Sequence, residues 1–189
     1  MSTAAEVLRF WFGEPCATQP RGEWFRKDAA FDAQIRAVFG ADIETALAGG
    51  LRDWDATPAG TLARIVLLDQ FTRNSFRDTP RAFAGDTLAL AAAQALVARG
   101  GDQRLPALQR WFAYMPYEHS ESREVQRESL RLFDALAVAD PGMADARLYA
   151  QKHADIIERF GRYPHRNAVL GRASTPEEEA FLRQPGTSF

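Results

Sequence analysis

Residues 57–76 read TPAGTLARIVLLDQFTRNSF, and this stretch decides the fold class. Thr57 followed by Pro58 is typical of a helix start, where a capping hydroxyl precedes a proline at the first helical position. Apolar residues then recur at helical spacing, and further apolar residues fill the remaining faces. A helix that is apolar nearly all round is expected inside a domain, so the stretch predicts a central, buried helix over about 61–76.

Similar start and stop signals predict helices along the rest of the chain. Asp86 is expected to cap an alanine-rich helix that Gly100 ends, and Gly161 is expected to end a later one. The predicted helices cover 4–12, 28–48 with a potential break at Gly40, 61–76, 86–99, 106–114, 122–139, 143–160 and 175–182. No strand alternation is visible, and the short connections favour stacked antiparallel helical hairpins. We therefore predict an all-α single domain over residues 1–189, with 171–189 as a loosely held tail.

The composition fits one globular domain. The chain has 189 residues, of which 46% are hydrophobic, and a formal net charge of −2, which argues against a nucleic-acid-binding surface. The single cysteine, Cys16, excludes an intrachain disulfide framework and favours a reducing compartment. The start lacks a signal-peptide pattern, and no apolar run is long enough to span a bilayer. We expect a cytoplasmic protein with neither a nucleic-acid partner nor a membrane partner.

The central helix carries charges on its inward side. Asp69 shares a face with the apolar residues, and Arg73 and Arg77 follow it at intervals of four. Because a buried unpaired charge is costly, we expect Asp69 to pair with Arg73 and with a third group. Two interpretations stay open: an internal ion pair that fixes the helix register, or side chains that face a ligand.

A second polar stretch is Tyr114-Met115-Pro116-Tyr117-Glu118-His119-Ser120-Glu121. Pro116 disfavours helical geometry at the residue before it, so the stretch predicts a corner between helices. Ser120 and Glu121 are expected to cap the helix that follows. Glu118 and His119 have no such capping role, which makes them the candidate pair for acid–base catalysis.

A third stretch, Arg159-Phe160-Gly161-Arg162-Tyr163-Pro164-His165-Arg166, places three guanidinium groups and an imidazole at a helix end and in the loop after it. The first two arginines could serve the helix dipole alone, whereas proline stiffens the loop that presents His165, Arg166 and Asn167. The planar fork of arginine suits phosphate and carboxylate, so the stretch predicts a contact to an anionic small molecule or an acidic peptide. His153, on the inward face of the preceding helix, is either a satisfied core group or a proton carrier.

Several specific chemistries lack their motifs. The chain contains no phosphate-binding loop, dinucleotide-binding glycine motif, zinc-protease motif or hydrolase elbow. A metal site made from Glu118, His119, Glu121, His153 and His165 fits the residue types. No pair among them has diagnostic spacing and arginines are close, so the sequence predicts no metal and no cofactor.

Longer motifs make the chain similar to a known family. They are Phe10-Trp11-Phe12-Gly13, Trp24-Phe25, Leu68-Asp69-Gln70-Phe71 with Arg73-Asn74 and Arg77, Tyr114-Met115-Pro116 with His119-Ser120-Glu121, and His153 with the run from Arg159 to Asn167. On these motifs, which run through almost the whole chain, it resembles the bacterial group catalogued as domain of unknown function 924. The resemblance implies a tetratricopeptide-like stack of helical hairpins in the cytoplasm, and no established activity. Thr72 departs from the family pattern, in which proline is common at that place.

Three hypotheses about function follow. In the first, a helical scaffold binds an anionic small molecule or an acidic peptide. In the second, a metal-independent hydrolase or isomerase acts on a phosphate- or carboxylate-bearing metabolite, with Glu118 or His119 as acid or base. In the third, the charges form an internal network without a ligand. The candidate catalytic residues are Glu118, His119 and His153, the candidate ligand-binding residues are Arg73, Asn74, Arg77, Tyr114, Arg162, His165, Arg166 and Asn167, and the candidate structural ion pair is Asp69 with Arg73.

Overall fold

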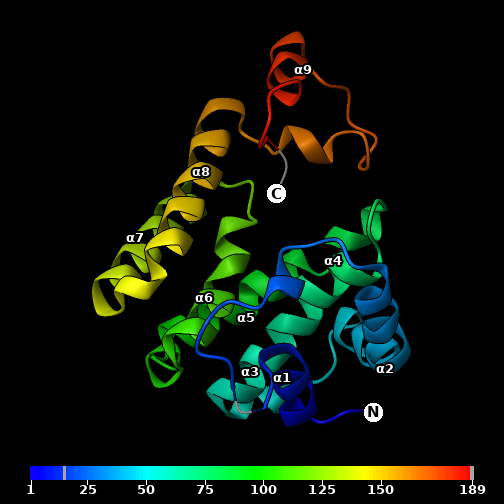
Figure 1. The fold of residues 1–189 in the computed structure, drawn as a ribbon, viewed down its shortest axis with the longest axis vertical. Coiled ribbons are helices and arrows are strands. Elements are labelled where there is room, and N and C mark those ends of the chain that lie inside the picture. Colours follow the sequence, from blue (N-terminus) through cyan, green and yellow to red (C-terminus); the bar gives the residue numbers. More distant parts are fainter. Residues whose placement is uncertain (15, 188–189) are drawn as a thin grey trace.

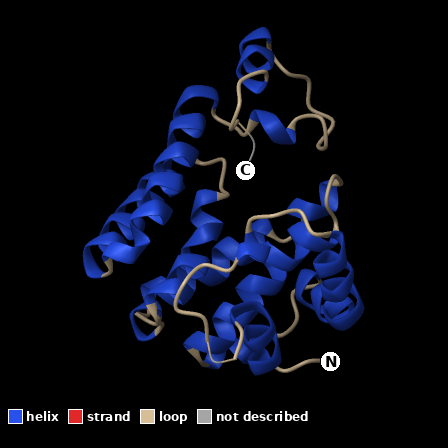
Figure 2. Cartoon of the chain, in the orientation of Figure 1, coloured by secondary structure: helices blue, strands red, loops and turns tan. Residues whose placement is uncertain are grey.

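The computed structural model describes residues 1–14 and 16–187, and every regular element in this part of the chain is helical (Figures 1 and 2). The α-helices are α1 (Ala4–Phe12), α2 (Ala29–Leu47), α3 (Pro58–Ile65), α4 (Thr72–Ser75), α5 (Asp86–Ala98), α6 (Ala107–Glu118), α7 (Arg123–Ala139), α8 (Ala144–Phe160) and α9 (Pro176–Leu182). Shorter 3₁₀ turns include η4 (Pro80–Phe83) and η7 (Pro164–Arg166). The protein is an all-α single domain, as predicted, whereas the tetratricopeptide-like stacking stays a prediction. No helix within these residues is both long and apolar enough to cross a bilayer.

A continuous helical rod lies at the centre of the domain. It consists of α3, the π-helical turn η3 (Val66–Phe71) and α4. The hydroxyl of Thr57 accepts a hydrogen bond from the backbone N–H of Gly60, and Pro58 occupies the first turn, which confirms the predicted start. Every residue from Gly60 to Thr72 is buried. Helices α1, α5 and α6 pack on α3, and α2 packs on η3, so the rod is the core of the fold.

The π-helical turn was not predicted, since the sequence indicated one regular α-helix. Within it, side chains hydrogen-bond to backbone carbonyls: the Thr72 hydroxyl donates to Leu68 O at 2.8 Å, and Arg73 Nη1 donates to Asp69 O at 2.8 Å. Gly85 lies against the same turn, because a Cβ at that position would be only 2.0 Å from the Leu68 carbonyl oxygen. The lack of a side chain at Gly85 therefore allows α5 to begin close to the polar part of the rod.

Two predicted helix breaks are absent. Helix α2 runs without interruption through Gly40, and α6 continues through Pro116 to Glu118 instead of ending at Tyr114. A glycine inside a helix costs about 1 kcal/mol and a proline about 3 kcal/mol. Burial of the aromatic side chains on both sides of Pro116, such as Phe112 and Tyr117, outweighs this local cost.

The corner after α6 consequently lies later than predicted. Helix α7 is capped by Ser122, whose hydroxyl accepts from Val125 N, and not by Ser120 or Glu121. Helices α7 and α8 form an antiparallel hairpin beside α6 (Figure 1), and Gly161 in the left-handed conformation ends α8 as predicted.

The segment after α8 folds back toward the end of α6. Its apolar contacts form a small separate cluster of Ile156, Ile157 and Tyr163, with Phe160 and Phe181 packed against it. The predicted loose tail, residues 171–189, contains α9, while its last part, Ser188 and Phe189, lies outside the described residues.

Candidate functional site

Four charged or ionisable side chains meet at the end of the rod. Asp69 is fully buried, and its Oδ1 lies 3.0 Å from Nη1 of Arg73 and 2.7 Å from Nδ1 of His119. Asp86, at the first position of α5, pairs with the same arginine at 2.9 Å. The predicted Asp69–Arg73 pair is therefore confirmed, and Asp86 and His119 are its further partners. Asp86 was expected to cap α5, but Gly85 holds the N-cap position and the carboxylate points into this cluster.

The protonation states of the pair follow from burial and charge. Burial raises the pKa of Asp69, but the charge of Arg73 and the contact with His119 outweigh it and hold this pKa below its usual value. Burial and the charge of Arg73 lower the pKa of His119, so its imidazole is neutral near pH 7. A neutral ring whose Nδ1–H donates to Asp69 keeps its lone pair on Nε2.

Glu118 lies beside this pair with few polar contacts. Its side chain is 2% exposed, and within the described part of the chain its Oε1 has no hydrogen-bond partner. Burial and the nearby charge of Asp69 raise the pKa of Glu118 well above its usual value. Burial therefore favours the neutral, protonated form of this carboxyl group.

Helix α8 brings His153 to the same place. Its Nδ1 lies 2.8 Å from the backbone oxygen of Tyr149 and 4.0 Å from Oε2 of Glu118, and its ring centroid is 6.1 Å from that of His119. Burial lowers the pKa of His153 to about 3. The expectation that this histidine faces inward is confirmed.

The loop after α8 supplies the remaining wall. Arg166 is 6% exposed, and its guanidinium carbon lies 4.7 Å from the ring centroid of Phe83 and 4.5 Å from that of Tyr163. Among the described residues it donates one hydrogen bond, from Nη1 to Asp86 Oδ2 at 3.3 Å, and its Nε is buried without a partner. Burial and the charge of Arg73 lower the pKa of Arg166.

Backbone contacts fix this loop against the corner after α6. The hydroxyl of Tyr163 donates to the carbonyl of Glu118, and Glu121 accepts from the N–H of Tyr163 at 2.8 Å. Arg172 pairs with Glu121 at 2.7 Å and also donates to the carbonyl of Tyr163. Gln126 on α7 donates to the Glu118 carbonyl at 2.7 Å. The position of the cluster thus depends on segments distant in sequence.

The structure brings together six of the predicted site residues: Asp69, Arg73, Glu118, His119, His153 and Arg166. His165 lies next to them, with its ring centroid 5.5 Å from that of Tyr163.

The other predicted ligand-binding residues lie elsewhere and have partners of their own. Asn74 and Arg77 bind Asp32 of α2, Tyr114 donates to Asp102, and Arg162 and Asn167 bind Glu178 of α9.

Sequence reasoning missed Asp86, Phe83, Gln126 and Arg172. Asp86 was predicted only as a helix cap, so its ion pairs with Arg73 and Arg166 were not expected. Its place as an acidic residue in the first turn of a helix could be seen in the sequence. For the other three residues, the contacts bridge segments that no local pattern connects.

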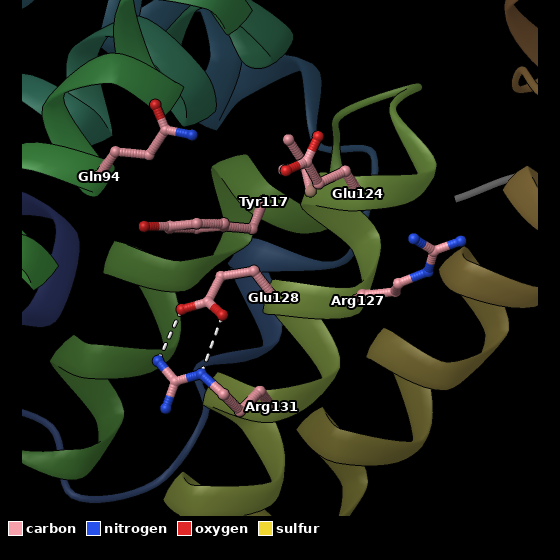
Figure 3. A pocket seen from close by; sticks show the side chains of 7 residues that line it. Gln94, Tyr117, Glu124, Arg127, Glu128 and Arg131 are labelled. Atoms are coloured by element: carbon pink, nitrogen blue, oxygen red, sulfur yellow. Dashed lines mark hydrogen bonds and ion pairs between the residues drawn. The ribbon is translucent and has the colours of Figure 1, made fainter.

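A surface hollow of about 660 Å³ lies apart from this cluster (Figure 3). Its lining comes from α5, α6 and α7 and includes Tyr117, Glu128 and Arg131, the last two of which form an ion pair at 2.6 Å. None of its lining residues belongs to the buried cluster.

Comparison with known proteins identifies the family without assigning an activity. The model of a family described as bacterial protein of unknown function (DUF924) matches residues 7–186. A solved structure of the protein of unknown function ATU0120 from Agrobacterium tumefaciens is 37% identical, with 95% of this chain and 96% of that chain covered and a TM-score of 0.86. A comparison with curated proteins finds no match. The chain belongs to the bacterial DUF924 family.

Proposed function

We propose that this protein binds an anionic small molecule or an acidic peptide end at the cluster around Arg166. The observation that carries the proposal is the state of this guanidinium, which contacts the rings of Phe83 and Tyr163 and donates one hydrogen bond among the described residues. Arginine has five N–H donors in a planar fork that matches carboxylate and phosphate. Most of this donor capacity is therefore available to a ligand.

The local charges support an anion as the ligand. Arg73 and Arg166 both contact the single carboxylate of Asp86, and the positive charge of Arg73 lowers the pKa of Arg166. An incoming carboxylate or phosphate would relieve this repulsion and occupy the unused donors of Arg166. Asp86 and Arg73 are 21% and 19% exposed, so the cluster borders solvent on the side of these residues. We place the activity in the cytoplasm because the single cysteine, Cys16, fits a reducing compartment.

One further observation favours an enzyme as the second candidate. Nδ1 of His119 lies 2.7 Å from a buried carboxylate, and an imidazole held in this way has one tautomer and one orientation. With Nε2 of His119 as base and Glu118, whose pKa burial raises, as acid, the same cluster would serve a metal-independent hydrolase or isomerase acting on the bound anion. The third possibility is an internal network of charges without a ligand, and the experiment must be able to detect it.

The test compares two conservative substitutions made in the same motif. Binding of inorganic phosphate, small carboxylates, phosphate monoesters and acidic peptides is measured by calorimetry and by thermal shift in the presence of EDTA. Arg166→Lys keeps the charge but loses the fork, so we expect affinity to fall by about tenfold or more. Arg159→Lys makes the same change at a half-exposed arginine paired with Glu177, and should leave affinity unchanged.

The results separate the three hypotheses. Binding that is equal in the wild type and in Arg166→Lys would contradict the proposed site. Absence of any anion binding, together with lower stability of Arg166→Lys, would favour the internal network. Turnover of a bound ester that His119→Gln abolishes without weakening binding would establish the enzyme.

A further inference from the structure

Three side chains that can ligate a metal converge beside the anion site. Glu118 and His119 end α6, His153 comes from the middle of α8, and one ligating atom of each lies within 4.8 Å of those of the other two. All three side chains are at most 10% exposed. The residue types alone allowed such a site, but no spacing indicated it, because diagnostic spacing applies to ligands on one helix and these come from two.

Both histidines are oriented through the same ring nitrogen. Nδ1 of His119 lies 2.7 Å from the carboxylate of Asp69, and Nδ1 of His153 lies 2.8 Å from the carbonyl oxygen of Tyr149. A carboxylate and a backbone carbonyl are the acceptors that commonly hold metal-binding histidines, because they fix the tautomer with the lone pair on Nε2. Each ring is thus in the form that a metal requires.

Glu118 provides an independent observation. Its carboxyl group is almost completely buried, its Oε1 has no hydrogen-bond partner among residues 1–14 and 16–187, and the closest basic nitrogen paired with it is His153 Nδ1 at 4.0 Å. Buried carboxyl groups in proteins are normally satisfied by donors or by a cation. A bound cation would account for an otherwise unsatisfied group.

We propose that Glu118, His119 and His153 bind one divalent transition-metal ion of the zinc class. Two imidazoles and one carboxylate are a donor set that Zn²⁺ accepts, and three protein ligands leave a fourth position open. Ligand atoms of a tetrahedral zinc site lie roughly 3.3 Å apart, so the side chains must close by about 1.5 Å at most. This movement is small, because side chains on two helices share it.

With a metal ion bound, the net charge of the cluster would suit the anionic ligand of the proposed function. Asp69 and Asp86 balance Arg73 and Arg166, whereas ionised Glu118 balances one of the two metal charges. A net charge of about +1 therefore remains at the open position, next to the guanidinium of Arg166. An anion bound there would contact both the metal and the arginine, although metal binding itself does not depend on the anion.

The experiment measures metal binding directly. Protein stripped with a chelator is titrated with Zn²⁺ by calorimetry and with Co²⁺ by visible absorption, in which tetrahedral cobalt gives intense bands. We expect one ion per chain, a higher melting temperature, and affinity that falls by more than about tenfold in Glu118→Gln and in His153→Gln. The first variant preserves the shape of the side chain, so circular dichroism can show that its fold is intact.

A matched control comes from the remaining histidine. His165→Gln removes an imidazole from η7 that is not among the three ligands, and it should leave affinity and stoichiometry unchanged. The proposal is overturned if the wild type takes up no ion, if folded Glu118→Gln binds as tightly as the wild type, or if His165→Gln weakens binding as much as His153→Gln. Anion binding is measured with EDTA present, so failure of one proposal is distinguishable from failure of the other.

Discussion

Replacement of Asp69 by asparagine tests the central claim that its charge holds the buried cluster together. The carboxylate accepts hydrogen bonds from Arg73 at 3.0 Å, from His119 at 2.7 Å and from Gln70 at 2.5 Å. Loss of one partner of a buried ion pair costs about 3–5 kcal/mol. Because Arg73 keeps two hydrogen bonds to Asp86 and is 19% exposed, we expect the lower end of this range, about 3 kcal/mol.

The assay is equilibrium urea unfolding followed by circular dichroism and tryptophan fluorescence, with EDTA in the buffer. A loss of about 3 kcal/mol corresponds to a fall in melting temperature of roughly 6–12 °C for a domain of this size. Asp134→Asn is the control, since its ion pair with Arg147 is half exposed and its loss should cost less than about 1 kcal/mol. If Asp69→Asn loses less than about 1 kcal/mol with an unchanged urea dependence, the buried charge does not stabilise the cluster and our reasoning is wrong.

Three further outcomes are expected. A hydrogen bond from Arg162 lowers the pKa of Glu178 to about 2, so its contribution to stability is present above pH 4.5 or so and is lost as the pH falls toward 2. Urea midpoints measured across this pH range should show that Glu178→Gln lacks this pH-dependent stability. A pH profile identical to that of the wild type would contradict the prediction. Gly85→Ala would force a Cβ against the Leu68 carbonyl and should cost about 1–3 kcal/mol in urea unfolding. Gly40→Ala meets nothing within 4 Å inside α2, so it should raise the unfolding free energy by up to about 1 kcal/mol; a loss there would show a constraint that we have not identified.

Local patterns were sufficient for most of the helices. The cap at Thr57 and the stop at Gly161 are properties of a few adjacent residues, so the sequence contains all the information needed to predict them. The same holds for the Asp69–Arg73 pair, because a spacing of four within one helix places both side chains on one face. The predicted helix end before Pro116 was wrong, because tertiary burial of the neighbouring side chains outweighs the local preference of proline against a helix interior.

The candidate site was predicted in composition but not in arrangement. Arg162 and Arg166 stand in the same motif, yet one pairs with Glu178 and the other enters the cluster, and no local pattern distinguishes them. The meeting of His119 with His153 depends on how α8 packs on α6, which is a property of the tertiary fold. Residue types therefore indicated a polar site and several of its members, whereas which of the predicted residues meet in it followed only from the folded chain.

The arrangement of the cluster also has a consequence for biosynthesis. Asp69 and Arg73 belong to the rod around which the first half of the chain packs, whereas Tyr163 and Arg166 close the cluster from beyond α8. During synthesis from the N-terminus, the hydrophobic core can therefore begin to form well before the binding groups are complete. A nascent or truncated chain that stops before Tyr163 would hold much of the core but would lack Tyr163 and Arg166, so the anion binding that we propose would distinguish finished molecules from unfinished ones.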